Sequence, residues 1–231
     1  MLDINTVVYQ LPIEIDSSKI IDKIESVIMP KIGEGASDCS VTGTDDTNLD
    51  RWFSLNRGIL SRVYDPATKS LIPRDFVKYP NIGIPMPWRD DFIAINADGN
   101  ADQELVKWHP SMINGEIFNL KERIAEYLKI DPVLRCRCSF FKGPRSIPRH
   151  SDPHTPWRAH VNLKSGPGTE WIFFDEGSDE PVHWHQPSGT VWLMRTGNVE
   201  HAVNVPPGET RWQLFYHIWQ KDLGPNYYRY T

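Results

Sequence analysis

A histidine and an aspartate lie two positions apart in Pro148-Arg149-His150-Ser151-Asp152, and a further histidine, His201, follows much later in the chain. In an extended backbone, residues two apart project to the same side, so His150 and Asp152 can chelate one metal ion. A second imidazole from a distant segment would complete a facial arrangement of two histidines and one carboxylate. That arrangement holds non-haem iron(II) and leaves positions open for a bidentate co-substrate and dioxygen. The sequence therefore predicts an iron site with the ligands His150, Asp152 and His201, the last between two expected strands.

A carboxylate anchor is predicted at Arg211, which follows His201 across an expected turn. A guanidinium there could return towards the metal and grip a carboxylate with two parallel hydrogen bonds. The co-substrate 2-oxoglutarate carries such a carboxylate at the end remote from its metal-chelating keto acid. In a strand, Arg211 would share its side with the polar Gln213.

Three more side chains are expected near the same pocket. Alternation along Arg158-Ala159-His160 places Arg158 and His160 on one face of a strand. Trp192 immediately precedes the His201 segment, and we expect it to line the pocket.

Other histidines compete with these ligands. His154 lies close to Asp152, but a residue four positions after His150 needs a turn, and Pro153 intervenes. His183 and His185 share one strand face and would suit a cupin-type metal site if a glutamate followed within a few residues. None follows, so we expect a surface or substrate-facing strand there.

Three further polar residues have two interpretations each. Arg145 and Arg149 flank the metal loop, where they could bind a substrate carboxylate or remain solvated. His217 falls on the same strand face as Arg211, and a hydrogen-bonded core imidazole is favoured over a metal ligand.

The elements that position these residues change in character near residue 130. Apolar residues at helical spacing predict one helix between the Asp16-Ser17 start signal and Pro30, and a second over Leu120 to Leu128, ahead of Asp131-Pro132. Residues 40–110, rich in proline, glycine and aromatics, favour short strands and long loops. After residue 130, short β-type runs separated by turn residues predict an antiparallel sandwich or barrel. These runs are Val133 to Phe141, Arg158 to Leu163, Glu170 to Phe174, Thr190 to Met194, and Arg211 to Trp219.

Composition narrows the class of protein. The 231 residues include 25 basic and 30 acidic side chains, with neither sign gathered into a run, which argues against nucleic acid and anionic membranes as partners. A hydrophobic content of 39% excludes a disordered chain, and no stretch approaches the roughly 20 apolar residues of a membrane span. The three cysteines have no paired zinc spacing, so we expect them to be packed, in a reducing, cytoplasmic setting.

The region from about residue 133 to 219 resembles the aspartyl/asparaginyl β-hydroxylase-like 2-oxoglutarate oxygenases, which include bacterial free-proline hydroxylases. The resemblance rests on the linked motifs I-P-R-H-S-D, R-A-H-V-N-L, G-T-V-W-L-M, E-H-A-V-N-V and R-W-Q-L-F. Within them His150 and His201 match the family's iron histidines, and Arg211 matches its 2-oxoglutarate arginine. Arg158 and His160 match an R-x-H pair associated with co-substrate binding.

This resemblance implies a mainly β fold with flanking helices around a double-stranded β-helix (jelly-roll, cupin-like) core. The core would span 131–220 of a single oxygenase domain, 1–231, in which 1–130 supports the core and contributes to the substrate region.

The implied activity is iron(II)-, 2-oxoglutarate- and dioxygen-dependent hydroxylation of an unactivated C–H bond in an amino acid or amino-acid derivative. A carboxylate at Asp152 favours hydroxylation over halogenation, because carboxylate-free relatives use the vacant position for halide. Alternatives are a peptidyl Asp/Asn or lipid acyl hydroxylase, or a non-catalytic cupin-like metal-binding module.

Overall fold

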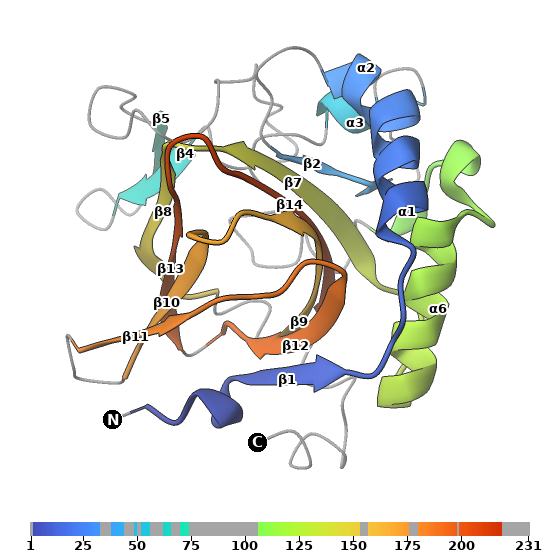
Figure 1. Cartoon of the computed structure of the whole chain (residues 1–231). Coiled ribbons are helices and arrows are strands. Elements are labelled where there is room, and N and C mark those ends of the chain that lie inside the picture. The colour runs from blue at the N-terminus through green and yellow to red at the C-terminus, as the bar shows by residue number, and fades with distance from the viewer. Residues whose placement is uncertain are drawn as a thin grey trace.

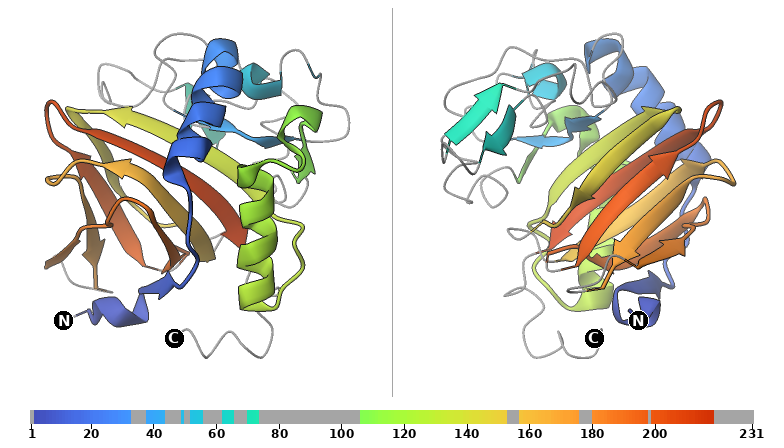
Figure 2. Two further views of the ribbon diagram at one scale, coloured as in Figure 1. Left: turned by 45° about the vertical axis from the view of Figure 1, so that its right-hand side comes forward. Right: turned by 90° about the vertical axis from the view of Figure 1, so that its left-hand side faces the viewer.

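Two antiparallel sheets face one another at the centre of the structure (Figures 1 and 2). The computed structural model describes residues 2–32, 38–43, 49, 52–55, 62–65, 70–73, 106–152, 157–175, 180–197 and 199–218. The larger sheet has the order β1 (Val8–Leu11), β12 (Thr190–Arg195), β9 (Trp157–Ser165), β14 (Thr210–Ile218), β7 (Arg135–Lys142), β2 (Asp38–Ser40). The smaller sheet has the order β11 (Pro181–Trp184), β10 (Glu170–Phe174), β13 (Glu200–Val205), β8 (Arg145–His150).

From β7 to β14 the chain passes back and forth between the two sheets. Strands β7, β9, β12 and β14 join the larger sheet, whereas β8, β10, β11 and β13 join the smaller one. Every pairing within the two sheets is antiparallel. This alternation defines a double-stranded β-helix, so the predicted jelly-roll core is confirmed.

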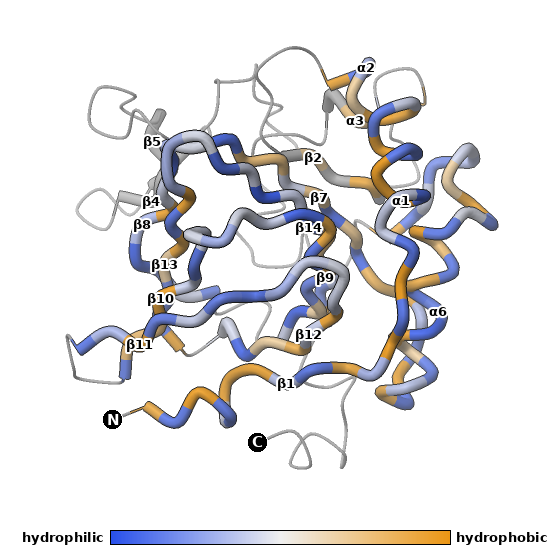
Figure 3. Tube along the Cα trace, in the orientation of Figure 1, coloured by the Kyte–Doolittle hydropathy of each residue, from blue (hydrophilic) through white to orange (hydrophobic). Residues whose placement is uncertain are grey.

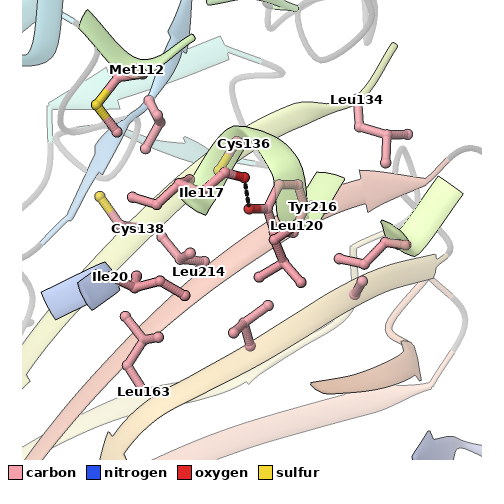
Figure 4. Packing of buried hydrophobic residues seen from close by; sticks show 14 of the residues in the cluster. Ile20, Met112, Ile117, Leu120, Leu134, Cys136, Cys138, Leu163, Leu214 and Tyr216 are labelled. Carbon is pink, nitrogen blue, oxygen red and sulfur yellow. Dashed lines mark hydrogen bonds between the residues drawn. The ribbon is translucent and has the colours of Figure 1, made fainter. Parts of the chain in front are cut away.

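Helices cover the outer face of the larger sheet (Figure 1; Figure 2, left). They are α1 (Ser17–Lys23), the π-helix η2 (Ile24–Ile28), α2 (Met29–Ile32) and α6 (Glu116–Leu128). Hydrophobic and hydrophilic residues alternate along α1 and α6, as expected of helices that bury one side (Figure 3). Figure 4 shows helix residues such as Ile20 and Leu120 packed against strand residues such as Leu214, and the Tyr216 hydroxyl donates a 2.6 Å hydrogen bond to the Ile117 carbonyl.

The predicted end of the first helix at Pro30 is wrong. The helix starts as predicted, with the Asp16 side chain accepting from the Lys19 N–H, but the helical path runs through Pro30 to Ile32. The Met29 N–H bonds the Ile24 carbonyl, one residue further back than in an α-helix. This wider π-turn accommodates a proline, which lacks an N–H and crowds the preceding turn of a regular helix.

Most of the other helices and strands predicted from sequence are confirmed. Helix α6 and the strands β7, β9, β10, β12 and β14 coincide with predicted segments within a few residues. Leu214, Tyr216 and Ile218 of β14 point into the core between the larger sheet and the helices. Arg211 and Gln213 therefore lie on the inner face, towards the smaller sheet, as predicted. Trp219 lies outside the described residues. Strands β8 and β13 were not predicted as strands, so His201 lies within β13 and not between two strands.

Smaller elements complete the described part of the chain. They are the 3-10 helices η1 (Ile4–Thr6) and η5 (Pro110–Met112), helix α3 (Trp52–Leu55), and the strand pairs β3 (Thr42–Gly43) with β6 (Lys107–Trp108) and β4 (Arg62–Asp65) with β5 (Ser70–Pro73). Most of the predicted loop-rich segment 40–110 lies outside the described residues. Among the helices that are described, none has the length and apolar content needed to cross a membrane.

The three cysteines are fully buried, as the packing interpretation predicted. All three belong to the core between the larger sheet and the helices. Cys39 and Cys138 lie directly opposite each other on β2 and β7, with their Sγ atoms 3.1 Å apart.

Candidate metal centre

The two predicted histidine ligands face each other across the smaller sheet. His150 ends β8 and pairs in register with His201 on β13, and their ring centroids are 4.4 Å apart. Between Ile147 and His150, β8 has two residues opposite one residue of β13, which is a β-bulge. The extra residue is accommodated where Pro148 interrupts the strand, on the edge of the sheet, and this bulge brings His150 opposite His201.

Backbone carbonyls set the orientation of both imidazoles. Nδ1 of His150 lies 2.7 Å from the Pro148 carbonyl oxygen, and Nδ1 of His201 lies 3.0 Å from that of Val199. Because a carbonyl only accepts, each Nδ1 carries the proton and each Nε2 keeps its lone pair. This second-sphere arrangement is typical of metal-bound histidines, whose other nitrogen donates to a carbonyl or carboxylate.

Asp152 completes the group from the loop after β8. Its N–H donates to the Thr196 carbonyl at 2.8 Å, which ties the loop to the end of β12. Its Oδ2 lies 3.4 Å from Nε2 of His201 and 2.6 Å from Nη1 of Arg158. One nitrogen or oxygen atom from each of His150, Asp152 and His201 lies within 4.8 Å of the others. Atoms that share one first-row cation at about 2.1 Å each are about 3–4 Å apart, so small side-chain rotations suffice for binding.

His150 and Asp152 have the protonation states that metal binding requires. Burial and the neighbouring His201 lower the pKa of His150, which keeps the imidazole neutral. Burial opposes ionisation of Asp152, but the Arg158 guanidinium, whose Nη1 lies 2.6 Å from Oδ2, outweighs it, so the pKa of Asp152 lies well below the ordinary value. A neutral imidazole and an ionised carboxylate are the forms that bind metal.

Arg211 lies on the inner face of the larger sheet and is 1% exposed. Its guanidinium carbon is 4.8 Å from the centre of the Trp171 ring and 5.7 Å from that of Phe141. Nη2 donates to Oε1 of Gln213, whereas Nε and Nη1 have no hydrogen-bond partner within the described part of the chain. Burial alone lowers the pKa of Arg211 to about 9, so the side chain is still a cation at neutral pH. A buried cation with an unsatisfied donor edge fits the far carboxylate of 2-oxoglutarate.

Arg211 is hydrogen-bonded to a neutral amide, that of Gln213, which belongs to a network of buried amides. Gln213 donates from Nε2 to Oε1 of Gln186 at 2.7 Å, and Gln186 donates to the His160 carbonyl at 3.2 Å. The Asn162 side chain donates to the Gln186 carbonyl. Burial and the nearby Arg158 and Arg211 lower the pKa of His160 well below the ordinary value, so its ring is neutral. Nδ1 of this ring lies 3.3 Å from Oε1 of Gln213.

Trp171 on β10 connects the metal ligands to the arginine. Its indole ring lies 5.6 Å from the imidazole of His201 and 4.9 Å from that of His160, and Arg211 packs over it. The indole also stacks on Phe173 with an interplanar angle of 6°. One aromatic side chain therefore separates the candidate metal site from the candidate carboxylate site, which suits a short molecule with a group at each end.

The structure thus brings together the predicted residues His150, Asp152, His201, His160 and Arg211. Arg158 ion-pairs with Asp152 and so lies at the metal end of the pocket. Trp192 is opposite His160 in the larger sheet, half-buried at the edge of the cluster between the sheets, where it packs edge-on against Trp184.

The competing residues lie elsewhere or are not described. The exposed His183 pairs with Glu170 at 2.8 Å, and His185 contacts the Thr169 carbonyl, so neither joins the metal group. His217 is buried on the inner face of the larger sheet. Burial and nearby arginines lower its pKa well below the ordinary value. His154 lies outside the described residues.

The two flanking arginines differ from each other. Arg149 ion-pairs with Glu200 and packs over the ring of Phe174. Arg145 packs over the ring of Phe141, 4.4 Å from its centre.

Two residues of the site were missed from sequence. They are Trp171 on β10 and Gln186, which lies between β11 and β12. Alternation along Glu170 to Phe174 could have placed Trp171 on the inner face. No local pattern predicts that Gln186 meets Gln213, because these residues belong to different parts of the chain.

Comparison with known proteins gives only distant matches. The sequence matches no family model, and no curated protein matches it. Among solved structures, a 2OG-Fe(II) oxygenase family oxidoreductase from Burkholderia pseudomallei has 20% identity over 36% of this chain and 41% of its own, with a TM-score of 0.32. A Pseudomonas putida prolyl-4-hydroxylase has 19% identity over 44% and 59%, with a TM-score of 0.34, and hazelnut vicilin has 10% identity over 42% and 26%, with a TM-score of 0.31. In each case the match spans less than two thirds of the other chain, and similarity at this level carries no information on activity.

Proposed function

We propose that this protein is an iron(II)- and 2-oxoglutarate-dependent dioxygenase that hydroxylates an unactivated C–H bond of a small, amino-acid-like substrate. One observation carries the proposal. His201, one of the three candidate metal ligands, and the buried Arg211 on the larger sheet, which has an unsatisfied donor edge, contact the same indole, Trp171.

Each side chain then has a role that follows from its position. His150, Asp152 and His201 would hold iron(II), with Nε2 of both imidazoles directed to it by the carbonyl contacts of Nδ1. Arg158 keeps Asp152 ionised and oriented. Arg211 would bind the far carboxylate of 2-oxoglutarate, and the apolar walls around it exclude water, which strengthens this ion pair.

Iron(II) with bound 2-oxoglutarate would activate dioxygen and supply the oxygen atom for the substrate, with succinate and carbon dioxide as co-products. The protein contributes geometry and a water-poor pocket. A small amino-acid-like substrate is proposed from the resemblance of the core motifs to a family that includes free-proline hydroxylases.

The test is spectroscopic and then catalytic. Iron(II) and 2-oxoglutarate added to the protein without oxygen should give the weak visible charge-transfer band of a keto-acid chelate. Admission of oxygen should then yield succinate, and a screen of amino acids and their derivatives should identify one that stimulates succinate formation and gains one oxygen atom in mass. Stimulation by peptides or acyl lipids instead would retain the enzyme class and change the substrate class.

The rival function is a non-catalytic module that holds a metal through His183 and His185. The double variant H183Q/H185Q is the matched control, since both histidines lie away from the metal group. We expect it to retain the band and succinate formation. Loss of metal binding in this variant, with no band in the parent protein, would favour the rival.

A further inference from the structure

The buried charge of Arg211 has a neutral partner where an acid would be expected. Buried arginines are normally paired with a carboxylate, because an uncompensated charge in the interior is destabilising. Within the described part of the chain, no carboxylate forms an ion pair with Arg211, and its Nη2 donates to the amide oxygen of Gln213. Residue 213 thus offers a hydrogen bond without a negative charge.

The orientation of the Gln213 amide is fixed by its other contacts. Its Nε2 donates to Oε1 of Gln186, so its oxygen must face Arg211. Gln186 is fixed in turn, because its Nε2 donates to the His160 carbonyl. Gln186 and Gln213 are each 2% exposed or less, so bulk solvent does not compete for these hydrogen bonds.

We propose that Gln213 is a positioning residue whose neutral amide holds Nη2 of Arg211 and leaves the charge, with the Nε and Nη1 edge, for the carboxylate of an incoming ligand. This inference rests on the proposed function, in which that ligand is 2-oxoglutarate. A glutamate at position 213 would have nearly the same shape, but it would neutralise Arg211 from within and compete with the ligand. The amide at 213 therefore determines whether the pocket accepts an anion.

The decisive variant is Gln213→Glu. Its carboxylate would form a charge-assisted hydrogen bond with Arg211, which offsets the contact that Oε1 of Gln186 loses with Nε2 of residue 213. We expect the metal-free variant to melt at a temperature at least as high as that of the parent protein. The dissociation constant for 2-oxoglutarate, measured by calorimetry on the iron(II)-loaded protein without oxygen, should rise at least tenfold. With the substrate present, KM for 2-oxoglutarate should rise while kcat at saturation stays within about twofold.

Gln213→Met separates charge from hydrogen bonding. Methionine has a similar volume and cannot accept the Arg211 hydrogen bond, but it adds no charge. Its affinity loss for 2-oxoglutarate should be smaller than that of Gln213→Glu, with a lower melting temperature because Gln186 loses a donor. Trp212→Phe is the control on the same strand, since Trp212 packs on the outer face against Phe140, and it should leave 2-oxoglutarate affinity unchanged.

The outcomes are distinct. A stable Gln213→Glu protein with weakened 2-oxoglutarate binding supports the inference. Unchanged affinity in Gln213→Glu, or an equal or larger loss in Gln213→Met, overturns it while the proposed function stands. No 2-oxoglutarate binding by the parent protein overturns the proposed function, and the inference with it.

Discussion

Replacement of Arg211 by methionine should stabilise the metal-free protein and abolish its response to 2-oxoglutarate. Methionine has a similar length and would occupy the same space between Trp171 and Phe141 without a charge. Substitutions that remove a charged group from the interior usually destabilise a protein when they leave an opposite charge behind. Here the described residues provide no opposite charge to leave.

The magnitude follows from burial. Burial alone lowers the pKa of Arg211 from its ordinary value to about 9. At 1.36 kcal/mol per pKa unit, a shift of this size corresponds to a destabilisation of about 5 kcal/mol for the charged form. The methionine leaves the Gln213 oxygen without its main donor, which costs about 1–3 kcal/mol. The net gain of about 2–4 kcal/mol should raise the melting temperature by about 4–16 °C in a chain of this size.

The assay is thermal unfolding of the metal-free protein, followed by circular dichroism and repeated with iron(II) and 2-oxoglutarate without oxygen. A ligand at one hundred times its dissociation constant stabilises the parent protein by about 2.7 kcal/mol, whereas the variant should gain only the contribution of iron. Arg123→Met is the control, because that arginine is 40% exposed and pairs with Glu116 on the surface. A metal-free Arg211→Met protein that melts below the parent, or one that 2-oxoglutarate still stabilises, would refute the argument.

Further predictions concern the metal ligands, their support and pH. His150→Ala and His201→Ala should each abolish iron retention and succinate formation, and normal succinate production by either iron-supplied variant would remove that residue from the ligand set. Arg158→Met should weaken iron binding by about 10- to 100-fold, because Asp152 loses the guanidinium that orients it, and a metal titration with a competing chelator measures this. Burial lowers the pKa of His150, His160 and His217 below the ordinary 6.5 in the folded protein. As the pH falls below 6.5, these histidines therefore take up protons in the unfolded chain before they do so in the folded protein. The free energy of unfolding of the metal-free protein should therefore be highest above pH 6.5 and decrease below it, by up to about 1.4 kcal/mol per pH unit for each of the three histidines. Denaturant unfolding at several pH values would detect this decrease, and His217→Asn should reduce its slope; a flat profile between pH 6.5 and 5 would contradict the assignment.

Much of the fold was predictable because its signals are local. The alternation of inward polar and outward apolar residues identified β14, and an Asp-Ser start signal identified the beginning of α1. Strand β8 was missed because Pro148 and the bulge break its alternation. The path of the helix through Pro30 also escaped prediction, since a π-turn depends on packing against the sheet that no local pattern encodes.

The sequence by itself determined the chemical types of the candidate site. The H-x-D spacing, a later histidine and a downstream arginine are sufficient to predict a metal group and a carboxylate anchor, because the extended backbone sets which side chains can share a ligand. Only the tertiary structure decided how they meet. Strand pairing brings His201 opposite His150, and the packing of the two sheets places Trp171 between them and Arg211. The neutral partner of Arg211 is Gln213, whose amide is held by Gln186 from a distant part of the sequence, and no local pattern predicts such a long-range contact.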